Sequence, residues 1–403
     1  MFESIFDKLA SDISNSPKLG DEYIRCWQDF LSDVWQRIPD SILKKTAQDC
    51  DLSPHLLRES LRTSFEGLIN GLPENSDKVP SPVRVKRRAG ETRTEQHPSF
   101  ARTAIVSSGN IPLVALAPAV MLASAQIPVI VKLSRADAAL FPWLLHEIER
   151  RNKRLHAGIY AHHWPSDAPE LQELFKFADK IFVFGSNQTV GFFQQNYPEK
   201  TVGFGHKFSV GYCETASADN IFMEGFARDA ALYFQRGCLS LQALFVKTPA
   251  DNLANWVDAF AQVYGQTVQK LHGGEGDVKP SKRLRQIQEI LDLQGIEYRR
   301  IVPNFGLAIQ TDRFAPELLH GEGALQIIPV KNVDEIFAQL KPFREMLQGL
   351  AIGCADKSRF ETLQLLAAEG GFSYVCESGE LQSPPLDWAN GGVTLPDDLF
   401  DEN

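Results

Sequence analysis

The chain has 403 residues, which is more than one ordinary compact domain needs and enough for two or three. With 43% hydrophobic and 23% charged residues, it has the composition of a globular protein with a sizeable core. The 41 basic and 51 acidic residues give a net charge of -10, which argues against nucleic acid as the main partner, because phosphate binding needs a positive surface. No stretch approaches the roughly 18 uninterrupted apolar residues of a membrane span. The acidic N-terminus lacks the basic and apolar regions of a signal peptide, so we expect a cytoplasmic protein.

Residues 1 to about 72 show the pattern of amphipathic helices. Ser53-Pro54 predicts a helix start, with serine as the N-cap and proline at the first helical position. Residues 73–82 are polar and marked by prolines, which is typical of a linker or a surface strand pair. A basic run follows at residues 84–88. Its simplest interpretation is a solvated edge, and the alternative is a contact for an acidic carrier or for coenzyme phosphates.

From Ala104 the chain alternates short apolar runs with helical segments, which predicts βαβ units and a parallel sheet covered on both faces. The expected strands lie at residues 104–106, 128–132, 158–160 and 180–184, and the expected helices include 140–150 and 168–178. A second α/β segment follows, with a strand expected at 241–246 and a helix at 252–268. Open α/β sheets bind ligands beyond the carboxyl ends of their strands, so the polar residues that follow these strands are candidates for a site.

The six cysteines, at positions 26, 50, 213, 238, 354 and 376, form no CxxC pair and show no metal-ligand spacing. We expect reduced thiols, and each cysteine alone is more often a small buried hydrophobe than a nucleophile. Cys238 follows Gly237 at an expected strand entry, where the thiol and its own N–H can face one pocket. His162-His163 has no carboxylate or cysteine at ligand spacing, so we expect no metal site.

Five short motifs occur in one order along the chain: Ser108-Gly109-Asn110-Ile111-Pro112-Leu113, Val131-Lys132-Leu133-Ser134, Gly205-His206-Lys207-Phe208-Ser209, Gln235-Arg236-Gly237-Cys238-Leu239-Ser240 and Gln382-Ser383-Pro384-Pro385-Leu386-Asp387-Trp388. Together they resemble the aldehyde dehydrogenase superfamily, and more closely the bacterial fatty acyl-CoA reductases of the LuxC type. The first 95 residues lie outside this resemblance.

The resemblance implies an α/β fold of the aldehyde dehydrogenase type, with a parallel-sheet, Rossmann-type cofactor domain, an α/β catalytic domain and a helical N-terminal extension. We expect the helical region and linker at residues 1–95, the NADPH-binding domain at 96–235, the catalytic domain at 236–372 and a C-terminal tail at 373–403.

For catalysis, the resemblance implies that Cys238 is the acyl-accepting thiol and that Asn110, with the Cys238 backbone N–H, forms the oxyanion hole. Taken alone, Asn110 is a common turn residue. His206 is a further catalytic candidate, because it could help to deprotonate Cys238 or protonate the aldehyde oxygen. A local packing or capping role explains His206 equally well.

For the cofactor, the resemblance implies that Lys132 contacts the adenosine ribose and that Ser134 belongs to the same binding segment. NAD-preferring relatives carry a glutamate where this chain has Arg135, and an arginine there favours the 2′-phosphate of NADPH. Gly185 and Ser186, at a strand-to-helix turn, can place a pyrophosphate at a helix N-terminus.

Two departures from the superfamily pattern bear on the reaction. Ordinary aldehyde dehydrogenases carry a general-base glutamate where this chain has Gly203, and that base activates the water that hydrolyses the acyl-enzyme. A second glutamate, which holds the nicotinamide ribose, is replaced by Leu325. Glu214 is close to Gly203 in sequence, but we interpret it as a structural surface residue.

The resulting hypothesis is an NADPH-dependent reductase that converts a long-chain fatty acyl thioester to the aldehyde. The expected acyl donor is fatty acyl-CoA, an acyl carrier or an acyl-protein synthetase, and the chain is expected to form a homo-oligomer or a complex with such a synthetase. Two alternatives stay open: a non-acylating aldehyde dehydrogenase, and a non-redox acyltransferase or acyl-binding subunit.

Overall fold

The computed structural model describes residues 1–14, 20–70, 102–151, 158–214, 220–273, 282–301, 305–319, 321–393 and 395. The expected linker at 73–82 and the basic run at 84–88 lie outside the described residues. The chain forms two compact units, one made of Met1–Asp51, Phe65–His206 and Pro385–Asn403, the other of Leu52–Ser64 and Lys207–Pro384.

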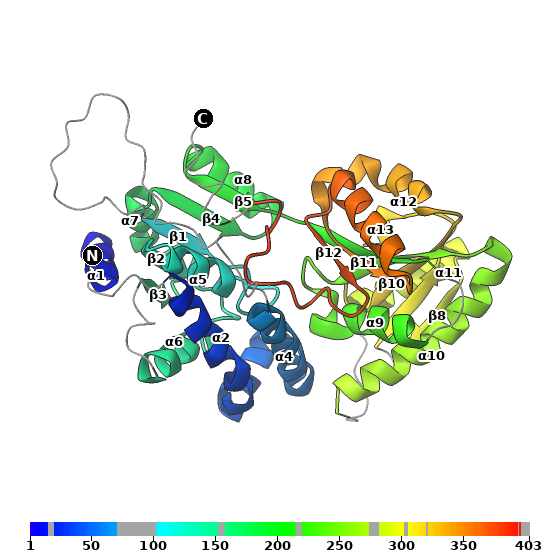
Figure 1. Ribbon diagram of the computed structural model, residues 1–403, viewed down its shortest axis with the longest axis horizontal. Helices are drawn as coiled ribbons and strands as arrows, with labels where there is room; N and C mark the ends of the chain where they lie inside the picture. The colour runs from blue at the N-terminus through cyan, green and yellow to red at the C-terminus, as the bar shows by residue number, and fades with distance from the viewer. Residues whose placement is uncertain are drawn as a thin grey trace. The chain divides into compact units, whose positions relative to one another are not determined.

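The first unit is built on a five-stranded parallel sheet of order β3-β2-β1-β4-β5 (Figure 1). Its elements in chain order are α1 (Phe2–Ser14), α2 (Gly20–Arg37), α3 (Asp40–Asp49), β1 (Thr103–Val106), α5 (Leu116–Ser124), β2 (Val129–Lys132), α6 (Leu140–Arg151), β3 (Ile159–His162), α7 (Pro169–Phe177), β4 (Lys180–Phe184), α8 (Asn187–Asn196) and β5 (Thr201–Phe204). The four strands expected between residues 104 and 184 are confirmed as β1 to β4, and the two expected helices as α6 and α7.

The chain order of this sheet creates a switch point between β1 and β4. From β1 the chain proceeds outward to β2 and β3, and it then returns to the other side of β1 for β4 and β5. Ligands of open α/β sheets bind at such a point, beyond the carboxyl ends of the strands. The residues that follow β1, β2 and β4 are therefore the ones to examine for a cofactor site.

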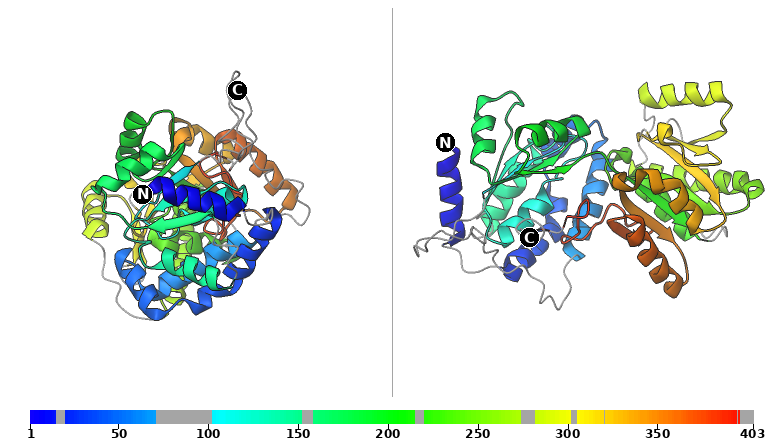
Figure 2. Two further views of the ribbon diagram at one scale, coloured as in Figure 1. Left: turned by 90° about the vertical axis from the view of Figure 1, so that its left-hand side faces the viewer. Right: turned by 90° about the horizontal axis from the view of Figure 1, so that it is seen from above.

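The N-terminal helices belong to the same unit. Phe2 and Phe6 of α1 are buried with side chains of β1, β2, β4 and α7 (Figure 2). The predicted helix start at Ser53-Pro54 is confirmed, since α4 covers Pro54–Asn70 and the Leu56 N–H donates to Ser53 Oγ (3.2 Å). By the division of the chain into units, α4 is shared, because Leu52–Ser64 belongs to the second unit.

The second unit contains a seven-stranded sheet of order β12-β11-β6-β7-β10-β9-β8, in which only β8 runs antiparallel to its neighbour (Figure 1). Its elements are β6 (Phe208–Cys213), α9 (Asn220–Ala231), β7 (Leu241–Lys247), α10 (Leu253–Leu271), α11 (Lys282–Gln294), β8 (Tyr298–Ile301), β9 (Gly306–Gln310), β10 (Ala324–Val330), α12 (Val333–Leu340), β11 (Leu347–Gly353), α13 (Lys357–Gly370) and β12 (Tyr374–Glu377). The strand predicted at 241–246 and the helix predicted at 252–268 correspond to β7 and α10.

Alternation along the buried strand β7 divides the second core into two layers. Leu244 and Val246 pack with α9 and α10, whereas Ala243 and Phe245 pack with α12 and α13. The sheet is thus covered by helices on both faces, as its mostly parallel strands require.

The unit boundary falls at residues 206 and 207, whereas the sequence places a domain boundary at 235 and 236. The difference arises because β6 pairs with β7 and β11, which ties residues 208–213 to the second sheet. In the same way β12 pairs with β11, so residues 374–377 of the expected tail are part of that sheet.

Candidate active site

Cys238 lies in a tight turn that precedes β7. The N–H of Ser240 donates to the carbonyl of Gly237 (3.1 Å), and the N–H of Gly237 donates to Ser240 Oγ (3.1 Å). The strand itself begins at Leu241, so the expectation that Cys238 starts a strand is wrong by three residues. The reason is local, because the reciprocal bonds between Gly237 and Ser240 close the turn before the sheet can begin.

Three left-handed residues in succession lead into this turn. Tyr233, Phe234 and Gln235 have φ values of 52°, 52° and 57°. Side chains with a Cβ rarely adopt this conformation, and such strain persists where the surrounding structure over-determines it. Here the Tyr233 N–H donates to Ser60 Oγ (3.0 Å), and the Glu322 N–H donates to the Phe234 carbonyl (3.2 Å).

Two buried glutamines fix the same backbone. The Gln235 amide donates to the Leu241 carbonyl (2.7 Å) and accepts from the Gly323 N–H (2.7 Å). The Gln242 amide donates to the Gln235 carbonyl (3.0 Å). Buried amides whose donors and acceptors are used hold their backbone in one arrangement. The left-handed segment is therefore held from both sides by side chains of its own unit.

Residues distant in sequence complete the support. Ser209 Oγ donates to the Cys238 carbonyl (2.8 Å) and accepts from the Gly349 N–H (2.9 Å). The Gln382 amide donates to Ser240 Oγ (3.2 Å). Three of the five sequence motifs thus meet at one turn, those containing Ser209, Cys238 and Gln382.

Burial is the largest influence on the Cys238 thiol and raises its pKa to about 11. The backbone N–H groups of Cys238 and Leu239 and the charge of Lys207 act in the opposite direction. Lys207 itself donates through Nζ to the Glu345 carbonyl (2.9 Å). The thiol is therefore protonated near neutral pH in this structure, and the groups that favour the thiolate are the two amides and Lys207.

Asn110 lies in the loop that follows β1 in the first unit. Its amide oxygen accepts from Ser108 Oγ (2.5 Å), which orients the side chain. The sequence analysis overlooked the residue that shapes this loop, Asp137. Its fully buried carboxylate accepts from Ser107 Oγ and from the Leu113 N–H (2.5 Å). Leu113 has a left-handed φ of 64°, so this contact stabilises an unfavourable backbone conformation.

Asp137 also links this loop to the predicted cofactor segment, because it accepts from Ser134 Oγ (3.2 Å). Burial raises the pKa of Asp137 to about 6, in spite of the hydrogen bonds from Leu113, Ser107 and Ser134. The spacing Ser134-x-x-Asp137 was the available signal in the sequence, but a lone carboxylate after a strand gives no indication of its burial.

The cofactor residues predicted on β2 lie at its carboxyl end. Lys132 ends the strand, and partial burial lowers the pKa of its ammonium. Ser134 is buried and directed to Asp137, so it supports the segment from within. Arg135 is exposed and pairs through Nε with Asp49 of α3 (3.0 Å).

Gly185 and Ser186 lie between β4 and α8, next to the switch point. Ser186 is the N-cap of α8 and accepts from the Thr189 N–H (3.2 Å). A Cβ at Gly185 would approach the Thr189 side chain to 3.1 Å, which explains the glycine. The N-terminus of α8 thus has the position that an anion-binding helix needs, and Ser186 has a capping role in addition.

The two glutamate positions of the superfamily are filled in a way that excludes a carboxylate. A Cβ on Gly203 would lie well under 3.0 Å from Cγ1 of Val190, closer than real Cβ atoms come to a neighbour. Leu325 is fully buried in the core layer that contains α9 and α10. Glutamate at either position would have to displace packed apolar side chains.

His206 is exposed in the first unit, and its backbone N–H donates to Asn187 Oδ1 (2.8 Å). Asn110 and His206 belong to one unit and Cys238 to the other, so the structure describes each within its own unit.

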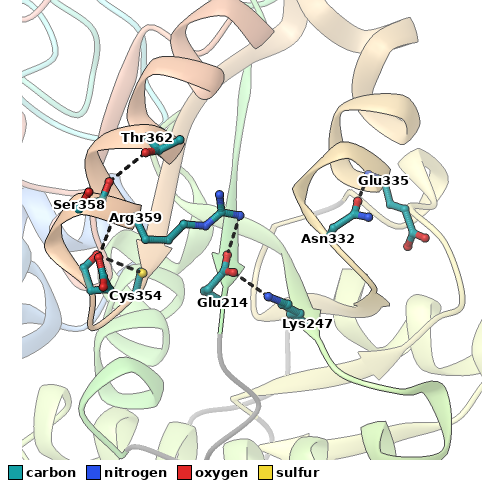
Figure 3. A network of polar contacts seen from close by, with 9 residues as sticks. Glu214, Lys247, Asn332, Glu335, Cys354, Ser358, Arg359 and Thr362 are labelled. Carbon is teal, nitrogen blue, oxygen red and sulfur yellow. Dashed lines mark hydrogen bonds and ion pairs between the residues drawn. The ribbon is translucent and has the colours of Figure 1, made fainter.

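Glu214 has a structural role, as its ion pairs show. Its carboxylate pairs with Lys247 (2.7 Å) and Arg359 (3.5 Å), which joins the ends of β6 and β7 to α13 (Figure 3). Within the described ranges, no group of three or more His, Cys, Asp and Glu side chains could hold a metal ion. None of the helices in the described part of the chain is both long and apolar enough to cross a membrane.

Comparison with solved structures identifies the fold as that of an aldehyde dehydrogenase. A glyceraldehyde-3-phosphate dehydrogenase from Methanocaldococcus jannaschii, complexed with NADP, has a TM-score of 0.61 at 14% identity, over 94% of this chain and 85% of that chain. An acetylating aldehyde dehydrogenase from Geobacillus thermoglucosidasius has a TM-score of 0.56 at 12% identity, over 96% of this chain and 86% of that chain. No curated protein matches the sequence significantly.

Within this fold, residues 86–272 match the model of the acyl-CoA reductase (LuxC) family. The family resemblance carried by the sequence motifs is therefore confirmed. Family and fold together support an oxidoreductase that acts on acyl or aldehyde groups.

Proposed function

We propose that this protein is an acyl-CoA reductase that uses NADPH to reduce a long-chain fatty acyl thioester to the aldehyde through an acyl-enzyme on Cys238. The match to the acyl-CoA reductase family supports this reaction class. One observation favours reduction over hydrolysis. Val190 fills the space that a general-base side chain at residue 203 would need, so the acyl-enzyme meets no activating carboxylate from that position.

The first step is acyl transfer to sulfur. The Cys238 thiolate attacks the acyl carbon, the bond between that carbon and the coenzyme sulfur breaks, and the leaving thiolate takes up a proton. Because burial raises the pKa of Cys238, the thiol must lose its proton as substrate binds, and Lys207 and the amides of Cys238 and Leu239 stabilise the resulting charge. In this proposal Asn110 keeps the role of oxyanion donor that the family resemblance gives it.

The second step forms the product. When bound, NADPH supplies the hydride that reduces the acyl carbon. The bond from that carbon to Cys238 then breaks, the aldehyde carbonyl forms, and the thiolate is restored. The rigid support of the turn by Ser209, Gln235 and Gln382 keeps the sulfur in place through both steps.

The first unit has the features that a nicotinamide dinucleotide requires. Polar residues follow the strands on both sides of the switch point, α8 begins beside it, and Lys132 and Arg135 supply positive charge at the end of β2. The NADP-bound structure of the same fold supports this assignment by similarity. We propose a cytoplasmic enzyme whose acyl donor is acyl-CoA, an acyl carrier or an acyl-protein synthetase, and which works as a homo-oligomer or in a complex with that synthetase.

The test is reductant consumption that depends on the acyl donor. Purified protein is mixed with NADPH and palmitoyl-CoA, and nicotinamide absorbance and aldehyde are followed together. We expect equal amounts of NADPH consumed and aldehyde formed, with no turnover in Cys238→Ala. Release of coenzyme A without NADPH consumption would instead identify an acyltransferase or a hydrolase. A series of chain lengths, offered as coenzyme A and carrier-protein thioesters, then defines the donor.

A further inference from the structure

One carboxylate in the first unit lies between two cations that come from different parts of the chain. Asp49, the last residue of α3, accepts from Lys45 Nζ (2.8 Å) and from Arg135 Nε (3.0 Å). The Asp49 side chain is 3% exposed, whereas those of Lys45 and Arg135 are 52% and 78% exposed. The two cations cover the acid and themselves face solvent.

The atoms in this contact determine what Arg135 can still bind. Its guanidinium uses the Nε edge toward Asp49, and the high exposure of the side chain places the two terminal Nη groups in solvent. A guanidinium has five donors in a fixed plane, so fixing one edge also fixes the direction of the other. Asp49 thereby restricts a side chain that would otherwise sample many rotamers.

The position of this group in the sheet identifies its ligand. Arg135 follows Lys132 at the carboxyl end of β2, and β2 is the neighbour of β1, which borders the switch point. Two cations and one carboxylate leave one net positive charge here. A phosphate ester suits exposed Nη donors with a second cation nearby, because charge-assisted and bidentate bonds to phosphate are strong.

We propose that Lys45 and Asp49, from the N-terminal extension, complete the site for the 2′-phosphate of NADPH. Asp49 orients Arg135 so that its Nη groups bind the phosphate, and Lys45 offsets the charge of Asp49 and adds a second cation. This inference rests on the proposed function and deepens it. Both residues lie before the family match at 86–272, so a segment outside that match sets the preference for the phosphorylated cofactor.

A different role for Asp49 has to be distinguished. Carboxylates near the end of this strand can accept the ribose hydroxyls of NADH. An acceptor for ribose must be accessible, and the Asp49 side chain is covered by its two partners. The geometry therefore favours a positioning role for Asp49 over direct contact with the cofactor.

The experiment measures binding of NADPH, NADH and the fragment 2′,5′-ADP to the full chain by calorimetry, without acyl substrate. For Asp49→Asn we expect NADPH and 2′,5′-ADP to bind about fivefold more weakly, and NADH to change less than about twofold. Lys45→Ala should act in the same direction. In an Arg135→Ala background, Asp49→Asn should have no further effect, because it acts through that arginine.

The chain offers a matched control in Asp33 of α2. Asp33 likewise accepts from a cation one turn away, Arg37 (2.9 Å), and from a distant arginine, Arg151 (2.9 Å). Asp33→Asn should leave the binding of all three ligands unchanged, and its melting temperature reports what losing such a pair costs in stability. If Asp49→Asn melts no lower than Asp33→Asn, altered binding does not reflect unfolding.

The outcomes separate this inference from the proposed function. If NADPH binds and depends on Arg135, but Asp49→Asn leaves the ratio of NADPH to NADH affinity unchanged, the inference is wrong and the proposed function stands. Tighter NADPH binding in Asp49→Asn would also overturn it, since that result means the carboxylate only repels the phosphate. If neither NADPH nor 2′,5′-ADP binds the unmodified protein, the proposed function itself fails.

Discussion

The side chain of Val190 occupies the space into which a side chain at Gly203 would project, since a Cβ there would lie well under 3.0 Å from Val190 Cγ1. Val190 is on α8, is buried, and packs in the core that covers the first sheet. The helix that follows β4 and presents its N-terminus at the switch point therefore also excludes a general base from residue 203.

This contact predicts the result of restoring the base. Gly203→Glu alone should lower the free energy of unfolding by about 1–3 kcal/mol, as expected for overpacking. Combined with Val190→Ala, the glutamate should fit, and the enzyme should hydrolyse part of its acyl-enzyme to fatty acid. The measurement is the ratio of fatty acid to aldehyde, with Val190→Ala as the control. An unchanged ratio in a stable double variant would show that the absence of the base does not protect the acyl-enzyme.

The Gln235 amide should be needed for the geometry of the Cys238 turn. Gln235→Met removes its bonds to Leu241 and Gly323 and leaves buried backbone groups unpaired, at a cost of about 1–3 kcal/mol in the free energy of unfolding. We expect a fall of at least about tenfold in the rate of Cys238 acylation, measured in a single turnover.

Gln326 provides the matched control for that substitution. It is fully buried in the same unit and makes two bonds, both 2.9 Å, to the backbone of Ala315. Gln326→Met should therefore cost a similar amount of stability with little loss of acylation. Equal acylation losses in the two variants would mean that Gln235 matters only for folding.

The raised pKa of Cys238 should be visible in its reactivity. Because only the thiolate is alkylated, the rate with iodoacetamide should rise nearly tenfold per pH unit from about pH 7 to about pH 10 in the free protein. Lys207→Gln should raise the pKa further and slow alkylation at each pH, whereas Lys247→Gln, which removes a partner of Glu214, should not. Peptide mass spectrometry follows the modification at Cys238, and a rate that levels off below pH 8 contradicts the raised pKa.

Asp137 should make stability depend on pH in a defined direction. Its pKa is raised from 3.8 to about 6 in the folded chain, so the folded state binds the proton more tightly than the unfolded state. Its contribution is fully present below about pH 4 and is lost as the pH rises through 6. Asp137→Asn should remove this part of the pH dependence, measured by denaturant unfolding from pH 4 to 7. The same slope in both proteins would show that Asp137 ionises normally.

Much of the scaffold follows from the sequence because its signals are local. The apolar runs that became β1 to β4 and the cap at Ser53 each depend on neighbouring residues only. The family resemblance came from motifs, and the family match confirms it. What the sequence could not show was tertiary: that Gln382 bonds to Ser240, that Asp137 is buried between two loops, and that Asp49 pairs with Arg135 across 86 positions.

The central claim is that Cys238 carries an acyl group that is then discharged by reduction. The direct measurement is to incubate the protein with radiolabelled palmitoyl-CoA, isolate the labelled protein, and add NADPH. We expect the label on the peptide that contains Cys238, none in Cys238→Ala, and its release as palmitaldehyde when NADPH is added. Label that persists in Cys238→Ala, or that leaves as free fatty acid at the same rate with and without NADPH, would contradict the account.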